Sequence, residues 1–276
     1  MKPSSALRPD SLLRRAAFGL ALAAASFKRQ TVYRVNWLSG LLASSLALMV
    51  GFAVWSELIG DGELGGYDWS SMQAYLMICF VTSTLAWSGT EELIANRILD
   101  GDIAIDLTKP VDFQRTRAAE FFGSVAAAVP AGALGCAAVW LVFRPAPPES
   151  ATAAALACLS LVMLVPLVFG VNYMGILVCF WTRRYMSFKW AQDTLVTFMS
   201  GMMMPLSLMP HWLETLAWCL PFVHYAAAPA AIYLGRVDHA EAIGLLLAEA
   251  LWTVVLWGTG RLLWRHQIKQ VTVHGG

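Results

Sequence analysis

The chain has 276 residues, of which 58% are hydrophobic and 13% charged, and its mean hydropathy is +0.60. Soluble domains carry about a quarter charged residues, so this composition excludes a water-soluble globule and predicts a membrane protein. The net charge of +1, with no basic run longer than two residues, gives no indication of nucleic-acid binding.

The first thirty residues place a short apolar stretch between Arg14–Arg15 and Lys28–Arg29. An arginine pair before an apolar stretch also occurs in cleaved signal sequences, and this alternative stays open. A stretch of this length between two basic pairs suits a helix that lies in the cytoplasmic membrane interface. We therefore expect residues 1–35 to form a cytoplasmic N-terminal region with an interfacial helix that remains in the mature protein.

Six later segments are apolar and about as long as the 20 residues that a spanning helix needs. They are approximately Trp37–Trp55, Met72–Leu93, Ala118–Phe143, Ala153–Trp181, Trp190–Met209 and Ala242–Trp264. The sequence thus predicts an all-α polytopic protein, with a six-span transmembrane domain over residues 36–264 and a tail over residues 265–276. Seventeen of the nineteen Lys and Arg residues fall on one side of these spans. Because basic loops stay inside, we expect both termini in the cytoplasm.

The segment Leu216–Leu234 carries no formal charge and is long enough to be a seventh span. A seventh span would place the basic tail outside, against the pattern of the other loops. Prolines also divide this region into pieces too short to cross a membrane. We expect an outer re-entrant hairpin of short helices at about residues 210–238, bounded or interrupted by Pro205, Pro210, Pro221 and Pro229.

Motifs for catalysis, metal binding and nucleotide binding are missing from the sequence. No Lys follows a Gly, so there is no P-loop, and neither GxSG nor HExxH occurs. The five cysteines form no CxxC pair and suit packing positions. We expect no enzyme activity, no metal site and no cofactor in this chain.

Glu249 is the most deeply placed ionisable residue, about two turns into the last span from the outer side. An ionisable residue inside a membrane is a candidate functional group because it is costly to leave unpaired. A proton-coupled carrier usually needs several such groups along a path, so one Glu is a weak basis for that function.

The loop at about residues 91–113 is the most informative polar segment. Residues 91–100 predict a helix that continues the second span and ends at Gly101 as its C′ residue. After it, large aliphatic residues alternate with acidic ones, which favours a surface docked against a partner or the membrane over a solvated connector. Asp102 and Asp106 would contribute less than the aliphatic residues if they stay on a wet rim. The candidate docking residues are Glu91, Arg97, Asp100, Gly101, Asp102, Ile103, Ile105, Asp106, Leu107, Lys109 and Pro110.

Residues 97–114, RILDGDIAIDLTKPVDFQ, resemble the cytoplasmic loop of bacterial ATP-binding-cassette permeases of the ABC-2, or exporter, type. More narrowly, the chain is similar to the subgroup encoded beside a second permease and an ATPase. The basic entry to the first span at residues 33–36, the MPLSLMPHW turn at residues 204–212 and the Gly-Gly terminus also match. The resemblance covers nearly the whole chain, and its loop is the most specific part.

The resemblance implies a multi-pass permease of the bacterial plasma membrane that forms half of a translocation path. Its implied partners are a dimer of ATP-binding-cassette ATPases, which bind ATP and Mg²⁺, a second permease subunit or a second copy of this chain, and membrane lipid. The loop would couple the spans to the ATPase, and the outer hairpin would cap the path. The alternative is a secondary, ion-coupled transporter, although no inverted repeat or charged midplane site is evident.

Overall fold

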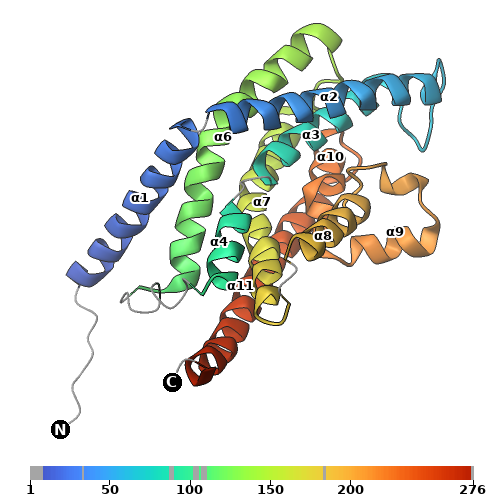
Figure 1. Cartoon of the computed structure of the whole chain (residues 1–276). Coiled ribbons are helices and arrows are strands. Elements are labelled where there is room, and N and C mark those ends of the chain that lie inside the picture. Colours follow the sequence, from blue (N-terminus) through green and yellow to red (C-terminus); the bar gives the residue numbers. More distant parts are fainter. Residues whose placement is uncertain are drawn as a thin grey trace.

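The computed structural model describes residues 9–32, 34–86, 90–101, 106, 111–182 and 185–274. Within these residues every regular element is a helix, which confirms the expected all-α class. Figure 1 shows a core of long helices, with α1 (Pro9–Val32) along one flank and the shorter helices α8 (Tyr185–Met199) and α9 (His211–Trp218) on the other. The start of α1 and the end of α11 (His239–His274) both lie toward the lower edge of that view.

Four helices are long and apolar enough to cross a membrane by length and composition. The qualifying stretches are Leu42–Ile59 within α2 (Arg34–Ile59), the whole of α6 (Phe113–Phe143), Ala151–Phe180, which covers α7 (Ala151–Leu177) and η1 (Val178–Phe180), and His239–Ile268 within α11. They coincide with the first, third, fourth and sixth predicted spans. The chain is therefore a multi-pass membrane protein.

The second predicted span corresponds to two helices rather than one. α3 (Trp69–Ala86) begins after Asp68, whose carboxylate accepts the backbone N–H of Ser71 at 3.1 Å. α4 (Thr90–Leu99) follows, and residues 87–89 between the two helices lie outside the described part of the chain. Neither helix alone meets the length and hydropathy of the four long ones.

The fifth predicted span was expected to run to Met209, and this boundary is wrong. α8 (Tyr185–Met199) ends ten residues earlier, because Gly201 adopts a left-handed φ of +85° and Pro205 follows it. At about 1.5 Å per residue, fifteen residues reach roughly 22 Å, which is less than the hydrocarbon core of about 30 Å.

The uncharged segment at residues 216–234 is broken into short pieces, as expected. After η2 (Leu206–Leu208) come α9 (His211–Trp218), η3 (Pro221–Tyr225) and α10 (Ala227–Tyr233). Pro221 starts η3, where its missing N–H costs nothing. Pro229, however, does not break the chain, because it lies in the first turn of α10, where a helix tolerates proline.

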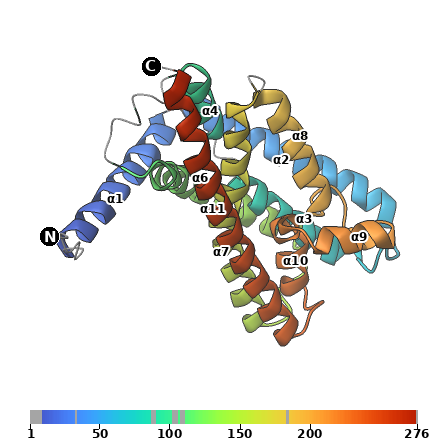
Figure 2. The same ribbon diagram turned by 90° about the horizontal axis from the view of Figure 1, so that it is seen from below.

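Helices α7 and α11 run side by side in both ribbon views (Figures 1 and 2), and the largest core cluster forms where residues of α6 pack against them. Phe169 stacks on Tyr173 at a centroid distance of 5.5 Å, and Trp257 lies 4.9 Å from Phe169. Trp257 Nε1 also donates a 2.9 Å hydrogen bond to the carbonyl of Pro166. The two contacts of Trp257 join α11 to α7.

Helix α1 packs against α6 rather than standing apart from the bundle. At Gly123 the two backbones approach so closely that a Cβ there would collide with the carbonyl group of Ala23. Phe18 and Leu20 on α1 remain exposed, at 45% and 72%. The expected position of this 24-residue helix in the membrane interface stays a prediction.

Candidate functional site

The predicted docking loop begins at α4, which has the charge pattern of a stable short helix. Glu91 and Glu92 lie in its first turn and Arg97 in its last, which complements the helix dipole. The helix ends as expected at Gly101, which has a left-handed φ of +83°. The N–H of Gly101 bonds to the Ile98 carbonyl at 3.3 Å.

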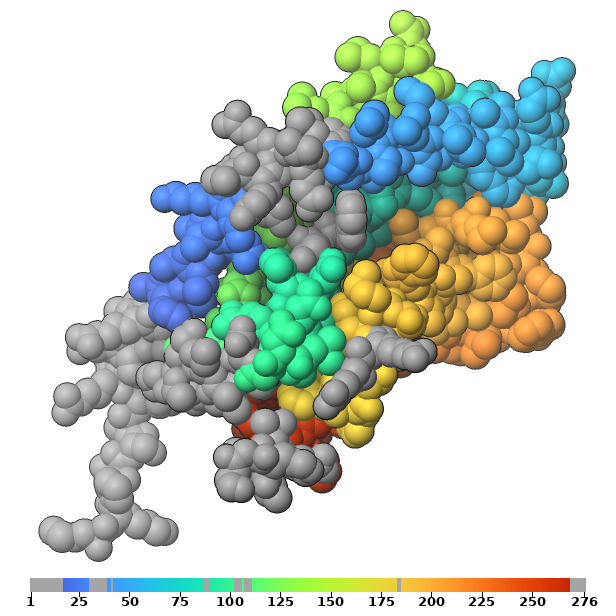
Figure 3. All heavy atoms as spheres, viewed as in Figure 1, coloured from blue at the N-terminus to red at the C-terminus, as the bar shows by residue number. Residues whose placement is uncertain are grey.

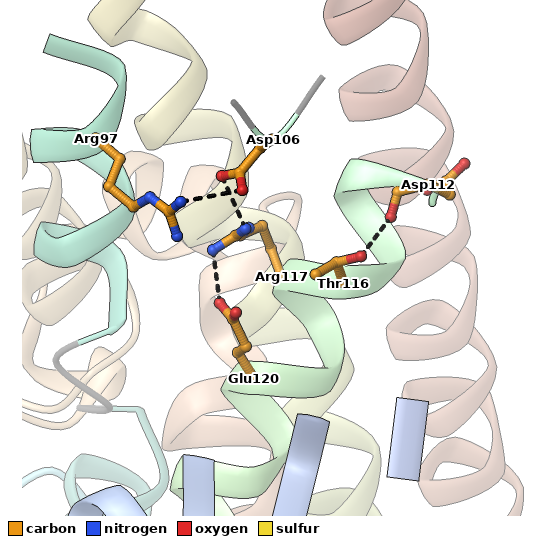
Figure 4. A network of polar contacts seen from close by, with 6 residues as sticks. All are labelled: Arg97, Asp106, Asp112, Thr116, Arg117 and Glu120. Atoms are coloured by element: carbon orange, nitrogen blue, oxygen red, sulfur yellow. Dashed lines mark hydrogen bonds and ion pairs between the residues drawn. The ribbon is translucent and has the colours of Figure 1, made fainter. Parts of the chain in front are cut away.

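Asp106 is the centre of a network of charged side chains that connects α4, the loop and α6 (Figure 4). Its Oδ1 lies 3.0 Å from Arg97 Nη2, and its Oδ2 lies 3.1 Å from Arg117 Nη2. Arg117 Nη1 in turn donates to Glu120 Oε2 at 2.8 Å. One carboxylate is thus held by guanidinium groups from two different helices.

Burial distinguishes the members of this network. The side chains of Asp106 and Arg117 are each 5% exposed, whereas that of Arg97 is 38% exposed. The guanidinium of Arg117 also lies 5.0 Å from the centroid of the Phe113 ring. Removing one member of a buried ion pair leaves the other charge uncompensated, at a cost of roughly 3–5 kcal/mol. The Asp106–Arg117 pair therefore fixes the loop more firmly than the Arg97 contact does.

The start of α6 is also attached to α11. Asp112 is the N-cap of α6, and its Oδ1 accepts the N–H of Arg115 at 3.0 Å. Its Oδ2 accepts a 2.7 Å hydrogen bond from Arg261 on α11. Phe113 stacks on Trp264 beside it, with ring centroids 4.1 Å apart and an interplanar angle of 5°.

The opposite end of α4 is held inside the bundle. Glu91 is 4% exposed, and its Oε1 accepts a 2.6 Å hydrogen bond from Asn172 Nδ2 on α7. Ile94 and Ala95 pack in the same core cluster as α7. α4 is therefore joined to α7 at its start and, through Arg97 and Asp106, to α6 at its end.

The remaining face of α4 reaches the molecular surface. Figure 3 shows α4 in teal-green on this side of the molecule, next to α8. Glu92, Leu93, Asn96 and Asp100 are exposed, and Leu93 is 48% exposed. These positions follow helical spacing, so they form one side of the helix. We call this set the outer face of α4.

Only part of the predicted docking set lies in the described chain. Glu91, Arg97, Asp100, Gly101 and Asp106 do: Glu91 is buried against α7, Arg97 and Asp106 belong to the charged network, Gly101 follows α4, and Asp100 is exposed on the outer face of α4. Asp106 does not stay on a wet rim, because two arginines and the start of α6 enclose it. Asp102, Ile103, Ile105, Leu107, Lys109 and Pro110 lie outside the described residues.

Sequence reasoning did not assign Asp112, Arg117, Asn172 and Arg261 to this site. The sequence places Arg117 and Arg261 only among the seventeen basic residues of the expected cytoplasmic side. The available signal was the acid-and-base spacing across residues 106–120, where alternate charges surround the start of an apolar helix. Asn172 gave no signal, because an isolated amide in an apolar span equally suits helix packing.

The structure also describes the predicted hairpin prolines and Glu249, which lie outside the loop. Pro205, Pro210 and Pro221 precede or begin η2, α9 and η3. Glu249 is completely buried in α11 and accepts a 2.9 Å hydrogen bond from Ser160 of α7. In the described part of the chain no group of three or more His, Cys, Asp or Glu side chains is placed to hold a metal ion.

Comparison with known families gives one match. A family profile described as "ABC-2 family transporter protein" matches residues 41–275, which include all four long helices except the first residues of α2. No curated protein matches the chain.

Proposed function

The chain belongs to the ABC-2 family of transporter proteins, and from that premise we propose that it is the permease subunit of an ATP-driven exporter whose ATPase is a separate chain. The family membership and the long apolar helices make the chain a membrane component of a transporter. The sequence lacks a P-loop, so ATP and Mg²⁺ bind to the partner ATPase. A second permease, or a second copy of this chain, completes the path.

The proposed topology has six spans with both termini in the cytoplasm of a bacterial plasma membrane. The four long helices provide four spans. α3 together with α4 provides the second, and α8 together with the turn after it provides the fifth. The short helices from η2 to α10 form the outer hairpin. This arrangement places the network around Asp106 on the cytoplasmic side, where the ATPase is.

The network around Asp106 is the observation that supports coupling through this loop. ATP-driven movement of a partner can act on the spans only through segments that are fixed to them. Asp106 is tied to α6 through Arg117, and α4 is tied to α7 through Glu91. Displacing the loop therefore displaces two spanning helices. The outer face of α4, with Leu93 exposed, offers adjacent contact area for the partner.

Removing the two buried charges tests the role of the network. Among the described residues, Asp106→Asn leaves the buried Arg117 paired only with Glu120, and Arg117→Met leaves the buried Asp106 paired only with Arg97. Each variant breaks the link between the loop and α6, so ATPase co-purification and ATP hydrolysis by the complex should fall at least tenfold. The double variant Asp106→Asn with Arg117→Met removes both buried charges and, of the network, leaves only the more exposed Arg97 and Glu120, so its loss should be smaller than the sum of the two single losses. Arg115→Met is the matched control, since Arg115 is exposed on the same helix turn.

Direct contact between the loop and the ATPase is tested by changing Ile103 and Ile105 together to Ser. Burial of an aliphatic side chain contributes roughly 1.5–3 kcal/mol, so losing two should reduce ATPase association by a large factor while membrane insertion is unchanged. Wild-type association and hydrolysis in both this variant and Arg117→Met would show that the loop is not the coupling surface.

A further inference from the structure

Three polar side chains from separate elements meet away from the coupling loop: Ser160 of α7, His224 of η3 and Glu249 of α11. Ser160 Oγ donates to Glu249 Oε2 at 2.9 Å, and His224 Nδ1 lies 4.0 Å from the same oxygen. Glu249 is 0% exposed and His224 is 2% exposed. The cluster therefore connects the outer hairpin to two long helices.

The hydrogen-bonding capacity of this cluster is not used up. Glu249 Oε1 and His224 Nδ1 have no hydrogen-bond partner among the described residues. An ionised carboxylate with a single hydroxyl donor is costly in an apolar interior, and so is an isolated imidazolium. One proton shared by the two groups gives zero net charge, whether it resides on the carboxyl or on the imidazole. A side-chain rotation that shortens the 4.0 Å distance between His224 Nδ1 and Glu249 Oε2 by about 1 Å then forms a hydrogen bond between them.

Neighbouring ionisable groups do not supply an alternative partner. The elements packed on η3 include α7, α8, α9, α10 and α11. In the described part of the chain, none of their other ionisable side chains bonds to Glu249 or His224. These side chains are Cys158 and Tyr173 on α7, Tyr185, Lys189 and Asp193 on α8, His211 and Glu214 on α9, Tyr225 on η3, Tyr233 on α10, and His239, Glu241, Arg261, Arg265 and His266 on α11.

We propose that Glu249 and His224 form a proton-binding site that keeps one proton while η3 is packed against α7 and α11. The proton stabilises the packed hairpin, because removing or adding a proton buries a net charge. The proposal rests on the proposed function in one respect only. The six-span topology makes the outer side of the membrane the side from which the proton reaches the site.

The pH dependence follows from counting protons. With the hairpin released into water, an exposed Glu titrates near pH ~4.3 and an exposed His near pH ~6.5. The released pair then holds one proton between about pH 4.3 and 6.5 and none above it, whereas the packed pair holds one throughout. Rising pH above about 6.5 therefore favours release, by roughly tenfold per pH unit.

Hydrogen exchange of the purified full-length chain, without any ATPase, measures the release. For a peptide covering residues 221–226, exchange is divided by the intrinsic rate at each pH. Local opening in the wild type should be constant from pH 5 to 6.5 and rise about tenfold per unit above it, until global unfolding dominates. A wild-type profile that is flat from pH 6.5 to 8.5 contradicts the proposal without the need for any variant.

Substitutions in the cluster should change how local opening depends on pH, and not only the amount of opening at one pH. In Glu249→Gln the packed cluster holds no titrating proton, so opening should become flat above pH ~6.5 and should increase below it as the released His protonates. In His224→Gln opening should rise with pH already from about pH 4.3. The matched control is His211→Gln, because His211 lies at the same 4.0 Å from Glu214 but is 95% exposed. It should leave the profile unchanged.

These outcomes are independent of ATPase association. If opening of the hairpin in folded wild-type protein does not depend on pH, the proton site is overturned and the exporter assignment is left intact. Wild-type ATPase binding in the loop variants overturns the coupling assignment and leaves the proton site intact.

Discussion

Asp68 shows how one residue organises the entry to a helix. Its carboxylate accepts hydrogen bonds from Ser71 and Ser70, including the backbone N–H of Ser71. The Ser71 side chain, followed by that of Ser70, holds the pKa of Asp68 below its ordinary value. The ionised form is therefore the one that caps α3.

Replacing this cap should lower stability in a pH-dependent way. Asp68→Ala should cost about 0.5–2 kcal/mol at pH 7, toward the lower end because the group is well exposed and screened by solvent. A carboxyl whose pKa is depressed on folding stabilises the fold above its unfolded pKa of about 3.9, and that contribution is lost as pH falls through the folded value. The difference in thermal midpoint between wild type and Asp68→Ala in detergent should thus shrink as pH falls below 4. Asp61→Ala, in the exposed loop before α3, should show little difference at either pH.

For single residues, the sequence predicted local backbone conformation better than it predicted burial and pairing with distant side chains. Gly101 was identifiable because a positive φ after a polar helix strongly favours glycine. Asp106 was predicted on a wet rim, but it is buried because it pairs with Arg117, eleven residues away on another element. Pairing at that separation is decided by how helices pack, which local patterns do not encode.

The packing of α1 on α6 can be tested by substituting alanine for glycine. In an open helical position Gly→Ala should stabilise by about 0.5–1 kcal/mol. Gly258→Ala on α11, where nothing lies within 4 Å of an added Cβ, should show this increase in thermal midpoint. Gly123→Ala should do the opposite, by about 1–3 kcal/mol, because the new methyl group meets the Ala23 backbone. Equal stabilisation of both variants would mean that α1 does not pack on α6 at this position.

Element boundaries were predictable where long apolar runs end in strong signals. α6 ends at Phe143, as expected, with Arg144 in the left-handed region as its cap. The end of α8 was misplaced because Met202, Met203 and Met204 continue the apolar pattern after the helix has stopped. Hydropathy reports preference for lipid, whereas the backbone at Gly201 decides where the helix ends.

The whole-molecule prediction is six spans with both termini inside. In a background with the native cysteines changed to Ser, single cysteines at Glu63, Pro147 and His211 should react with an impermeant thiol reagent applied to intact cells. Cysteines at Thr108 and Gly275 should react only after the membrane is opened. Reaction of Gly275→Cys from outside would require an odd number of spans and would reassign the hairpin as a crossing segment.

Helix α11 is hydrogen-bonded both at the buried Glu249 cluster and at the start of α6. α11 is unbroken over 36 residues, about 54 Å. Glu249 and Arg261 are twelve residues apart on it, roughly 18 Å, and they bind Ser160 and Asp112 respectively. A rigid rod transmits axial displacement in both directions. If protonation at Glu249 changes the affinity of the chain for its ATPase, the ATPase must change the proton affinity of Glu249 by the same factor, since linkage between two equilibria is reciprocal. In the proposed complex a proton would then be taken up from or released to the medium each time the ATPase engages, and this is measurable as a pH change in a weakly buffered solution.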